Sequence, residues 1–214
     1  MRARFFLPVL LPVTLLAALL LPLAARAGNH LPKVKPAQSY PGAMVQDQVA
    51  IAAVPYVTAD QQKLFAIPYR KFSFVPVRLI ITNNSDRPIS IADVRVYFIS
   101  ASNDRISAAT PDDVERAIPL RDKQGRKIPV GPFHVPTHSK DSDWRVQQDF
   151  NRYEYNALSV PAHSTIAGFI WYDVDGLGSN PLQNASLVVR EVKNADGQEL
   201  FYFQIPFNKY LGAR

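Results

Sequence analysis

No cysteine occurs among the 214 residues of this chain. The chain therefore cannot form a disulfide, has no thiol nucleophile, and lacks the residue on which a bacterial lipoprotein is acylated. If the chain is exported, it has neither a disulfide to staple its fold nor a lipid anchor at its N-terminus.

A large charge of one sign is also missing once the N-terminus is set aside. The formal charge is +6, but three arginines lie within residues 1–27, which leaves 21 basic and 18 acidic residues and a charge of +3. The densest basic segment, residues 121–127, is interrupted by Asp122 and contains no aromatic residue that could stack on a base. We therefore expect no nucleic-acid partner.

Sequence signatures of catalysis are absent as well. The chain has no G-x-S-x-G nucleophile elbow, and the adjacency of His163 and Ser164 in a turn does not make them a base and a nucleophile. The turn DVDG at residues 173–176 offers oxygen ligands for calcium but lacks the spacing of an EF-hand loop, so turn chemistry explains it equally well. These absences favour a non-enzymatic protein without a cofactor.

The first 27 residues have the pattern of an export signal. Arg2 and Arg4 precede an apolar run over residues 5–23, and alanines occupy the third and first positions before the expected cleavage site. A secretory peptidase requires this order of charge, apolar core and small residues. We expect cleavage near Ala27 and a periplasmic or secreted protein that meets the membrane only through this signal. An uncleaved signal anchor is the alternative, because the apolar run approaches the length of a bilayer span.

Cleavage leaves about 187 residues, enough for one domain with a sizeable core. The 18 prolines argue against long helices, because proline lacks the backbone donor that a helix interior needs. Residues 28–47 are polar and rich in proline, which predicts an extended arm or linker. Residues 48–210 form the expected domain, with a loop and helix insertion at about 101–156 where the strand pattern fades. Short helices are expected there from Pro111 to about Ala117 and over residues 143–155.

Short β-strands dominate the expected domain. Runs rich in β-branched and aromatic residues, separated by turns of Asn, Asp, Gly and Pro, occupy residues 49–54, 74–82, 89–100, 157–160, 165–173, 185–192 and 199–207. The second and third runs, joined by a short polar turn, predict a meander or hairpin, and the last two predict another hairpin. About seven strands without long alternating helices predict an all-β fold, namely an immunoglobulin-like antiparallel β-sandwich with short helices in an insertion.

Two segments of this sandwich resemble a group of uncharacterised exported bacterial proteins with an immunoglobulin-like fold. The first is the strand VPVRLIITNN at residues 75–84, which contains the pattern P-V-x-L-x-I-x-N. The second is PAHSTIAGFI at residues 161–170, a strand that follows proline and contains Gly-Phe. The resemblance covers about residues 48–207 and implies a fold and an exported location, but no activity.

Two histidines and two aspartates lie close together in the insertion. His134 and His138 precede Asp141 and Asp143 within ten residues. Imidazole and carboxylate groups are ligands of zinc and manganese, so a metal site is one interpretation of this segment. Pro136 excludes the helical spacing of ligands, and a solvated surface loop is the alternative.

Aromatic residues gather in two places. Trp144, Phe150, Tyr153 and Tyr155 lie in one polar segment of the insertion, and five more rings lie at residues 201–210. Exposed rings on a sandwich could stack on sugars or anchor a partner peptide. The alternative is that alternate rings fill the core.

Together these patterns predict an exported, non-enzymatic immunoglobulin-like module of the bacterial cell envelope. Its expected role is structural or is the binding of a protein or an envelope polymer. A glycan-binding accessory domain that uses the aromatic segment is the first alternative, and a metal-dependent hydrolase that uses the histidine and aspartate loop is the second. A strand edge left uncovered by the insertion would be the place at which a partner adds a strand.

Overall fold

The computed structural model describes residues 31–124 and 140–211 of the chain. The export signal expected at residues 1–27 lies outside these residues, as do His134 and His138. Within the described parts of the chain, no helix has both the length and the apolar character that crossing a bilayer requires.

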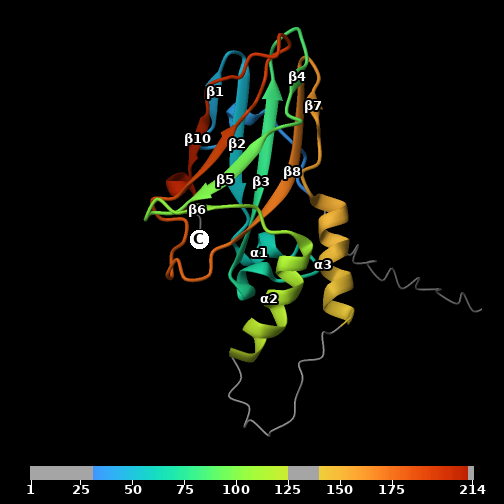
Figure 1. Cartoon of the computed structure of the whole chain (residues 1–214), viewed down its shortest axis with the longest axis vertical. Coiled ribbons are helices and arrows are strands. Elements are labelled where there is room, and N and C mark those ends of the chain that lie inside the picture. The colour runs from blue at the N-terminus through green and yellow to red at the C-terminus, as the bar shows by residue number, and fades with distance from the viewer. Residues whose placement is uncertain (1–30, 125–139, 212–214) are drawn as a thin grey trace, which may run out of the picture.

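Two four-stranded antiparallel sheets form the centre of the described structure (Figure 1). In spatial order, the first sheet consists of β1 (Met44–Gln46), β2 (Val49–Pro55), β3 (Phe74–Asn83) and β8 (Ser164–Asp173). The second consists of β10 (Phe203–Pro206), β9 (Ser186–Arg190), β5 (Arg95–Ile99) and β6 (Arg105–Ile106). Two short strands, β4 (Ile89–Ser90) and β7 (Ser159–Val160), pair with each other. The described residues therefore form a mostly β structure with antiparallel sheets, as the sequence predicts.

The helices of the described residues are short. They are η1 (Ala37–Ser39), α1 (Ala59–Gln62), η2 (Tyr69–Phe72), α2 (Pro111–Gln124), α3 (Lys140–Tyr153) and η3 (Phe207–Tyr210). The two longest, α2 and α3, have 14 residues each and both belong to the predicted insertion. Figure 1 shows them side by side at one end of the sheets.

The core between the two sheets is built mainly from aliphatic side chains at every second strand residue. Val75, Val77, Leu79 and Ile81 of β3 all belong to it and are at most 2% exposed. Apolar side chains of β5, β9 and β10 pack in the same cluster from the second sheet. Because burial of one such side chain contributes about 1.5–3 kcal/mol, this alternation holds the two sheets together.

The other face of β3 is buried as well, partly by the N-terminal arm. Of the segment expected to be an extended arm or linker, residues 28–47, the described part from residue 31 contains η1, which lies against β2 and β3, and β1, which joins the first sheet. Ala37 is fully buried in a cluster with Ala50 and Ile80, and its N–H donates to Thr82 Oγ1 at 2.8 Å. The small alanine side chains allow this close approach of the arm to the sheet.

The insertion covers the remaining part of this face with α2 and α3. Val114 and Ile118 of α2 and Val146 and Phe150 of α3 are buried in one cluster with Trp171 of β8. The helices therefore present their apolar side chains to the sheet. The expected insertion at residues 101–156 thus supplies a second core rather than a loop over the first one.

Helix α2 is longer than the sequence predicts. The expected helix ends near Ala117, whereas α2 continues through Pro119 to Gln124, about two turns further. A proline inside a helix removes a hydrogen bond and costs about 3 kcal/mol. Arg121 in this last part of α2 donates to the carbonyl of Phe72 and to Asp173, and these contacts offset part of the cost.

The strands pair differently from the expected meander. Strand β3 pairs with β2 and β8, whereas β5 lies in the other sheet and pairs with β6 and β9. The prediction that the runs at 74–82 and 89–100 are neighbours was wrong, because a turn at residues 91–94 directs the chain from β4 to the second sheet. The last hairpin is confirmed, since β9 pairs antiparallel with β10.

The outer edge of β8 is covered by the insertion. The N–H of Ala109 donates to the carbonyl of Trp171 at 2.8 Å, and the N–H of Tyr155 donates to that of Phe169 at 2.9 Å. Gly168 permits the second contact, because a Cβ there would lie only 2.5 Å from the Cα of Tyr155. The insertion therefore occupies positions on β8 that a partner strand would need.

Candidate functional site

Of the four predicted binding aromatics of the insertion, two are buried, one is half-buried and one is exposed. Phe150 is 2% exposed and stacks on Trp171 with ring centroids 4.0 Å apart, and Tyr153 is also buried. Tyr155 is half-buried, and burial raises the pKa of its hydroxyl. Trp144 alone of the four is exposed, at 62%. The glycan-binding alternative stays a prediction that depends on Trp144.

The predicted metal ligands are described only in part. His134 and His138 lie outside the described residues, and so does the side chain of Asp141. Asp143 lies in the first turn of α3 and accepts a hydrogen bond from Ser142 Oγ at 3.4 Å. Among the residues that the structure describes, no group of three or more His, Cys, Asp or Glu side chains could hold a metal ion. The metal-dependent hydrolase stays a prediction about the loop.

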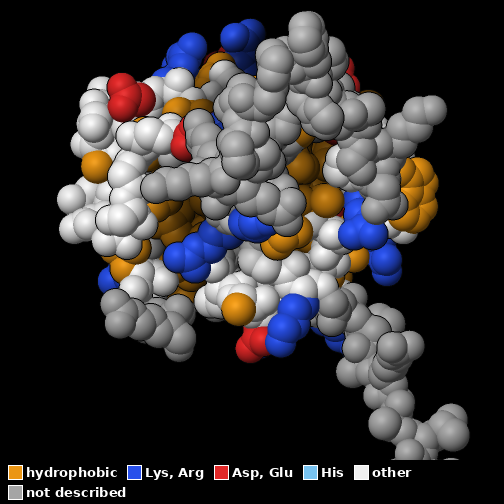
Figure 2. Space-filling model, turned by 90° about the horizontal axis from the view of Figure 1, so that it is seen from below, with side chains coloured by type: hydrophobic (Ala, Val, Ile, Leu, Met, Phe, Trp, Pro, Cys, Tyr) orange, Lys and Arg blue, Asp and Glu red, His pale blue; other side chains and the backbone are white. Residues whose placement is uncertain are grey.

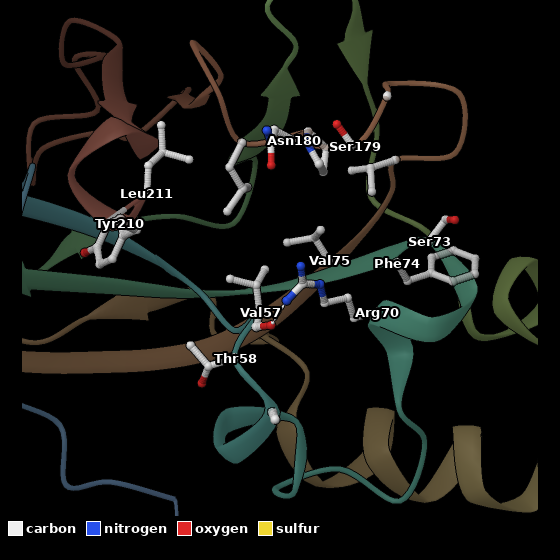
Figure 3. Close-up of a pocket in the computed structure, with 15 residues that line it drawn as sticks. Val57, Thr58, Arg70, Ser73, Phe74, Val75, Ser179, Asn180, Tyr210 and Leu211 are labelled. Atoms are coloured by element: carbon white, nitrogen blue, oxygen red, sulfur yellow. Dashed lines mark hydrogen bonds between the residues drawn. The ribbon is translucent and has the colours of Figure 1, made fainter. Parts of the chain in front are cut away.

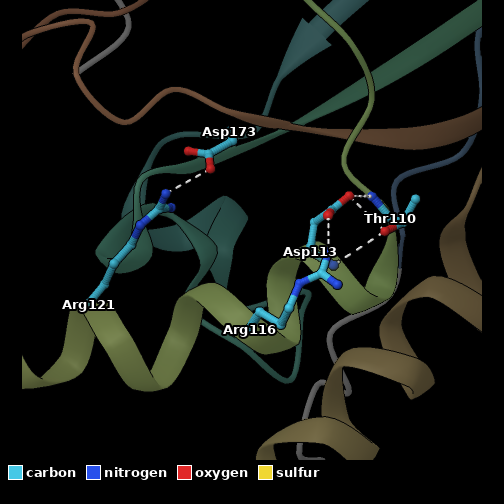
Figure 4. Close-up of polar contacts among 5 residues, drawn as sticks. All are labelled: Thr110, Asp113, Arg116, Arg121 and Asp173. Carbon is cyan, nitrogen blue, oxygen red and sulfur yellow. Dashed lines mark hydrogen bonds and ion pairs between the residues drawn. The ribbon is translucent and has the colours of Figure 1, made fainter.

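The turn that could offer oxygen ligands to calcium is occupied by a guanidinium. Arg121 Nη2 lies 2.7 Å from a carboxylate oxygen of Asp173 and 3.5 Å from one of Asp175. Figure 4 shows the first of these pairs, between the end of β8 and α2. Because the arginine already supplies positive charge there, the two carboxylates are structural ion-pair partners.

A cavity of about 520 Å³ opens beside this turn (Figure 3). Its walls come from four segments that are far apart in the sequence: the turn after β2, the end of η2 with the start of β3, the connection from β8 to β9, and η3. The lining residues are Val57, Thr58, Ala59, Arg70, Ser73, Phe74, Val75, Val174, Gly178, Ser179, Asn180, Pro181, Leu182, Tyr210 and Leu211. The volume lies within the range of about 300–1,000 Å³ that is typical of ligand pockets.

Local hydrogen bonds hold the turn after β2 in place. Thr58 and Gln61 form a capping box, in which Thr58 Oγ1 accepts from the N–H of Gln61. Gln61 Oε1 accepts in return from the N–H groups of Val57 and Thr58, each at 3.0 Å. A capping box satisfies backbone donors at the start of a helix and sets the direction from which the chain enters it. The carbonyl of Val57 is thereby held at the cavity wall.

Arg70 is the only charged residue of the described cavity lining. Its Nη1 donates to the carbonyl of Val57 at 2.7 Å, and its backbone N–H donates to Gln62 Oε1 at 3.2 Å. In Figure 3 the side chain points toward Val57 and Val75, and Ser179 and Asn180 lie across the opening. Arg70 is exposed, and its guanidinium lies beside Val57 and Val75 and faces polar side chains from another loop.

The acidic residues near the cavity are paired with other cations. Asp60 lies 2.6 Å from Lys63 Nζ, and this hydrogen bond lowers the pKa of the Asp60 carboxyl. Asp173 and Asp175 face Arg121, as described above. Within residues 31–124 and 140–211, no ion pair involves Arg70. Its positive charge is thus not balanced by a carboxylate of the described residues.

The remaining lining residues supply an apolar floor and a polar rim. Val75, Val174 and Leu182 belong to the main core and are at most 6% exposed, whereas Leu211 is 43% exposed and Val57 and Tyr210 are half-buried. Ser179 and Asn180 lie in an exposed turn whose backbone at Gly178 has a φ of 82°, a conformation that glycine adopts without steric cost. On the far side, burial raises the pKa of Tyr210 to about 12, and its hydroxyl donates to the carbonyl of Pro41.

This arrangement suits binding better than proton transfer. The described lining holds no carboxylate and no imidazole, the groups that most often exchange protons near neutral pH. The Arg70 guanidinium offers only hydrogen-bond donors, and the hydroxyl of Tyr210 already donates to a backbone carbonyl. The cavity can therefore attract and orient a ligand with its cation, hydroxyl groups and amide.

Sequence reasoning missed Arg70, although one pattern could have indicated it. Residues 61–85 contain four basic residues and no acidic one. A cation in such a segment finds a carboxylate only if the fold brings one from elsewhere, and for Arg70 the described structure brings none. Figure 2 views the end of the molecule at which the helices lie and shows lysine and arginine side chains around apolar ones, with fewer aspartates and glutamates.

A second exposed feature lies where the edges of the two sheets meet. Phe201 is 70% exposed, Tyr202 is 42% exposed, and their ring centroids are 4.8 Å apart. Val45 of β1 is 57% exposed, and Gln46 Nε2 donates to the carbonyl of Tyr202 at 3.5 Å. We call Val45, Phe201 and Tyr202 the aromatic edge. By contrast Phe203 is fully buried, so the rings at residues 201–203 divide between surface and core.

Comparison with known proteins adds no relative from which a role could be transferred. No protein-family model, no curated protein and no solved structure matches the chain. The two features of the described surface that bear on function are the cavity beside Arg70 and the aromatic edge.

Proposed function

We propose that this chain is an exported, non-enzymatic module of the bacterial cell envelope, with an immunoglobulin-like sandwich fold, that binds a ligand in the cavity beside Arg70. The sequence pattern of residues 1–27 supports export. The strand orders support the fold type: β2, β3 and β8 correspond to strands A, B and E of an immunoglobulin sheet, and β5, β9 and β10 to strands C, F and G.

The position of Arg70 at the cavity is the observation that carries this proposal. Arg70 is exposed, and in the described structure its guanidinium donates to one carbonyl and pairs with no carboxylate, so it is open to an anionic group of a ligand. The side chains of Val57, Tyr210 and Leu211 in the same lining add apolar surface that a ligand could cover. Convergent polar groups beside apolar surface are typical of a small-molecule or peptide site.

Binding of a partner protein at the aromatic edge is a second candidate function. Two adjacent exposed rings and Val45 form an apolar surface beside the edge strands β1 and β10. Aromatic residues carry much of the binding energy at protein interfaces. The substitution Phe201→Ser combined with Tyr202→Ser would abolish capture of such a partner, whereas Trp144→Ser on α3 would not.

Two measurements test the main proposal. The full chain is expressed in a bacterial host, the cells are fractionated, and the exported protein is sequenced from its N-terminus; we expect a start near Gly28 outside the cytoplasm. The purified exported protein is then screened by NMR with a set of neutral and charged apolar fragments. Amide shifts that cluster on the cavity lining support the proposal. A cytoplasmic protein, or fragment binding only elsewhere, contradicts it.

A further inference from the structure

We infer that the ligand of this cavity carries a carboxylate joined to an apolar group, and that Arg70 binds the carboxylate. The inference rests on the proposed function, because it names the ligand class for the same cavity. It follows from three properties of the site: the donors that Arg70 has left, the charge around it, and the apolar part of the lining beside it.

The guanidinium of Arg70 has donors to spare. Arginine carries five N–H donors in a planar fork, and the described structure uses one of them, from Nη1 to the carbonyl of Val57. This bond fixes one corner of the plane and leaves further N–H groups for a ligand. Two parallel N–H donors match the two oxygens of a carboxylate, which arginine binds in a bidentate manner.

The surroundings favour an anion. Asp60, Asp173 and Asp175, the acids on the neighbouring segments, are held by Lys63 and Arg121. None of them is paired with Arg70, so a ligand carboxylate would compete with no ion pair of the described residues. The hydroxyl of Ser179 and the amide of Asn180 at the rim supply neutral donors for the same anion.

The apolar part of the lining favours an apolar group over a simple inorganic anion. Val57 and Tyr210 are half-buried and Leu211 is 43% exposed at the cavity, and a phosphate or sulfate ion would leave their apolar surface in contact with water. A cavity of about 520 Å³ has room for a side chain or short alkyl chain besides the carboxylate. A free organic acid and the C-terminal residue of a peptide share this chemistry.

Matched pairs of probes test the inference on the exported full chain. We would titrate octanoate against octanamide, and N-acetyl-Leu-Leu with a free carboxylate against its C-terminal amide, by calorimetry and by NMR. At least one acid is expected to bind at least about tenfold more tightly than its amide, because a charge-assisted hydrogen bond is lost in the amide. If octanoate binds more tightly, the carboxylate of the ligand belongs to a free organic acid. If N-acetyl-Leu-Leu binds more tightly, it belongs to the C-terminus of a peptide.

Three variants locate the effect at Arg70. Arg70→Gln is expected to lower the affinity for the acid at least about tenfold and to leave that for the amide unchanged, and Arg70→Lys to give an intermediate loss. Arg116→Gln is the control, because Arg116 pairs with Asp113 on α2 outside the cavity (Figure 4). The acid and amide comparison on the unsubstituted chain decides the question even if a variant fails to fold.

The outcomes separate this inference from the proposed function. Equal affinity for acid and amide, with shifts on the cavity lining, overturns carboxylate recognition and leaves the binding cavity intact. An equal loss of affinity for the acid in Arg70→Gln and Arg116→Gln also overturns the role of Arg70. Absence of shifts on the lining with every acid, amide and neutral fragment overturns both.

Discussion

The core between the sheets and the core beneath the helices differ in the side chains that fill them. The first is mostly Val, Ile and Leu from alternate strand positions, whereas the second gathers aromatic rings from loops, helices and strands. In the second, Phe65 packs edge-on against Tyr69, Tyr153 and Phe169. Branched aliphatic side chains fill the even space between pleated sheets. Irregular segments leave uneven space that large rings fill.

The two cores also differ in polarity. Beneath the helices, the carboxylate of Asp149 is 3% exposed and accepts the N–H groups of Ala66 and Ile67. Trp171 Nε1 is buried there without a hydrogen-bond partner. A buried polar group without a partner costs about 1–3 kcal/mol. The aromatic core is therefore expected to open before the aliphatic core in native-state hydrogen exchange.

The largest expected effect comes from removing the central ring of the aromatic core. Trp171→Ala should lower the free energy of unfolding by about 3–5 kcal/mol, because it leaves a cavity next to Phe150. Trp144→Ala, at the exposed tryptophan of the same region, should change it by less than about 0.5 kcal/mol. Urea unfolding followed by circular dichroism measures both. Similar losses in the two variants would contradict the difference in packing.

A smaller effect should follow when the crossing of the insertion over β8 is blocked. Gly168→Ala places a methyl group against the backbone of Tyr155 and should cost about 1–3 kcal/mol. In this variant, hydrogen exchange of the Tyr155 amide should accelerate, because its hydrogen bond to the Phe169 carbonyl is displaced. Gly197→Ala is the control: it is strained at a φ of 78° but meets no atom within 4 Å, so exchange at Tyr155 should stay unchanged.

The Asp149 carboxyl in the aromatic core should make the free energy of unfolding depend on pH. Burial raises the pKa of Asp149, although the N–H groups of Ala66 and Ile67 lower it in part. The folded state thus holds this proton more tightly than the unfolded state, whose pKa is about 3.9. The stabilisation is complete below that value and is lost as the pH rises through the folded-state pKa.

Asp149→Asn tests this sign. The difference in unfolding free energy between the variant and the parent should shift in favour of the variant as the pH rises through this window. Chemical unfolding at a series of pH values measures it, with Asp112→Asn as the control, because Asp112 is exposed and forms no ion pair with a described residue. A difference that is flat with pH, or that shifts toward the parent, would show that the hydrogen bonds outweigh burial.

The smallest effect is expected at the aromatic edge. Tyr202→Ser should change stability by less than about 0.5 kcal/mol, because the ring covers neither core. Thermal unfolding of the variant measures this directly. A loss of stability above about 1 kcal/mol would show that the Tyr202 ring contributes to packing, and would contradict the assignment of the aromatic edge as a docking surface.

Part of the fold could be predicted from local patterns. The run that became β3 and the final hairpin follow from β-branched and aromatic content and from the turn residues that bound each strand, which are neighbours along the chain. The partners of β3 could not be predicted, because strands on either side of an insertion of more than 50 residues meet there. The passage of α2 through Pro119 likewise depends on Arg121 reaching Asp173, a contact between distant segments.

The candidate site was harder to predict than the fold. The sequence identifies the aromatic segment at Trp144, Phe150, Tyr153 and Tyr155, but its rings divide between surface and core according to which face of α3 meets the sheet. Arg70 carries no motif at all. Among the described residues Arg70 has no carboxylate partner. Whether a given cation is paired depends on contacts between distant parts of the chain, which the sequence does not show.

The sequence by itself determined the strand-rich class, the main turns, the absence of disulfides and the expectation of export, because each of these depends on composition or on neighbours along the chain. Only the tertiary structure decided which strands pair, which rings are buried, and which cation stays without a carboxylate among the described residues. The reason is physical: packing and charge neutralisation depend on distances in space, and at the cavity beside Arg70 those distances join segments more than 100 residues apart.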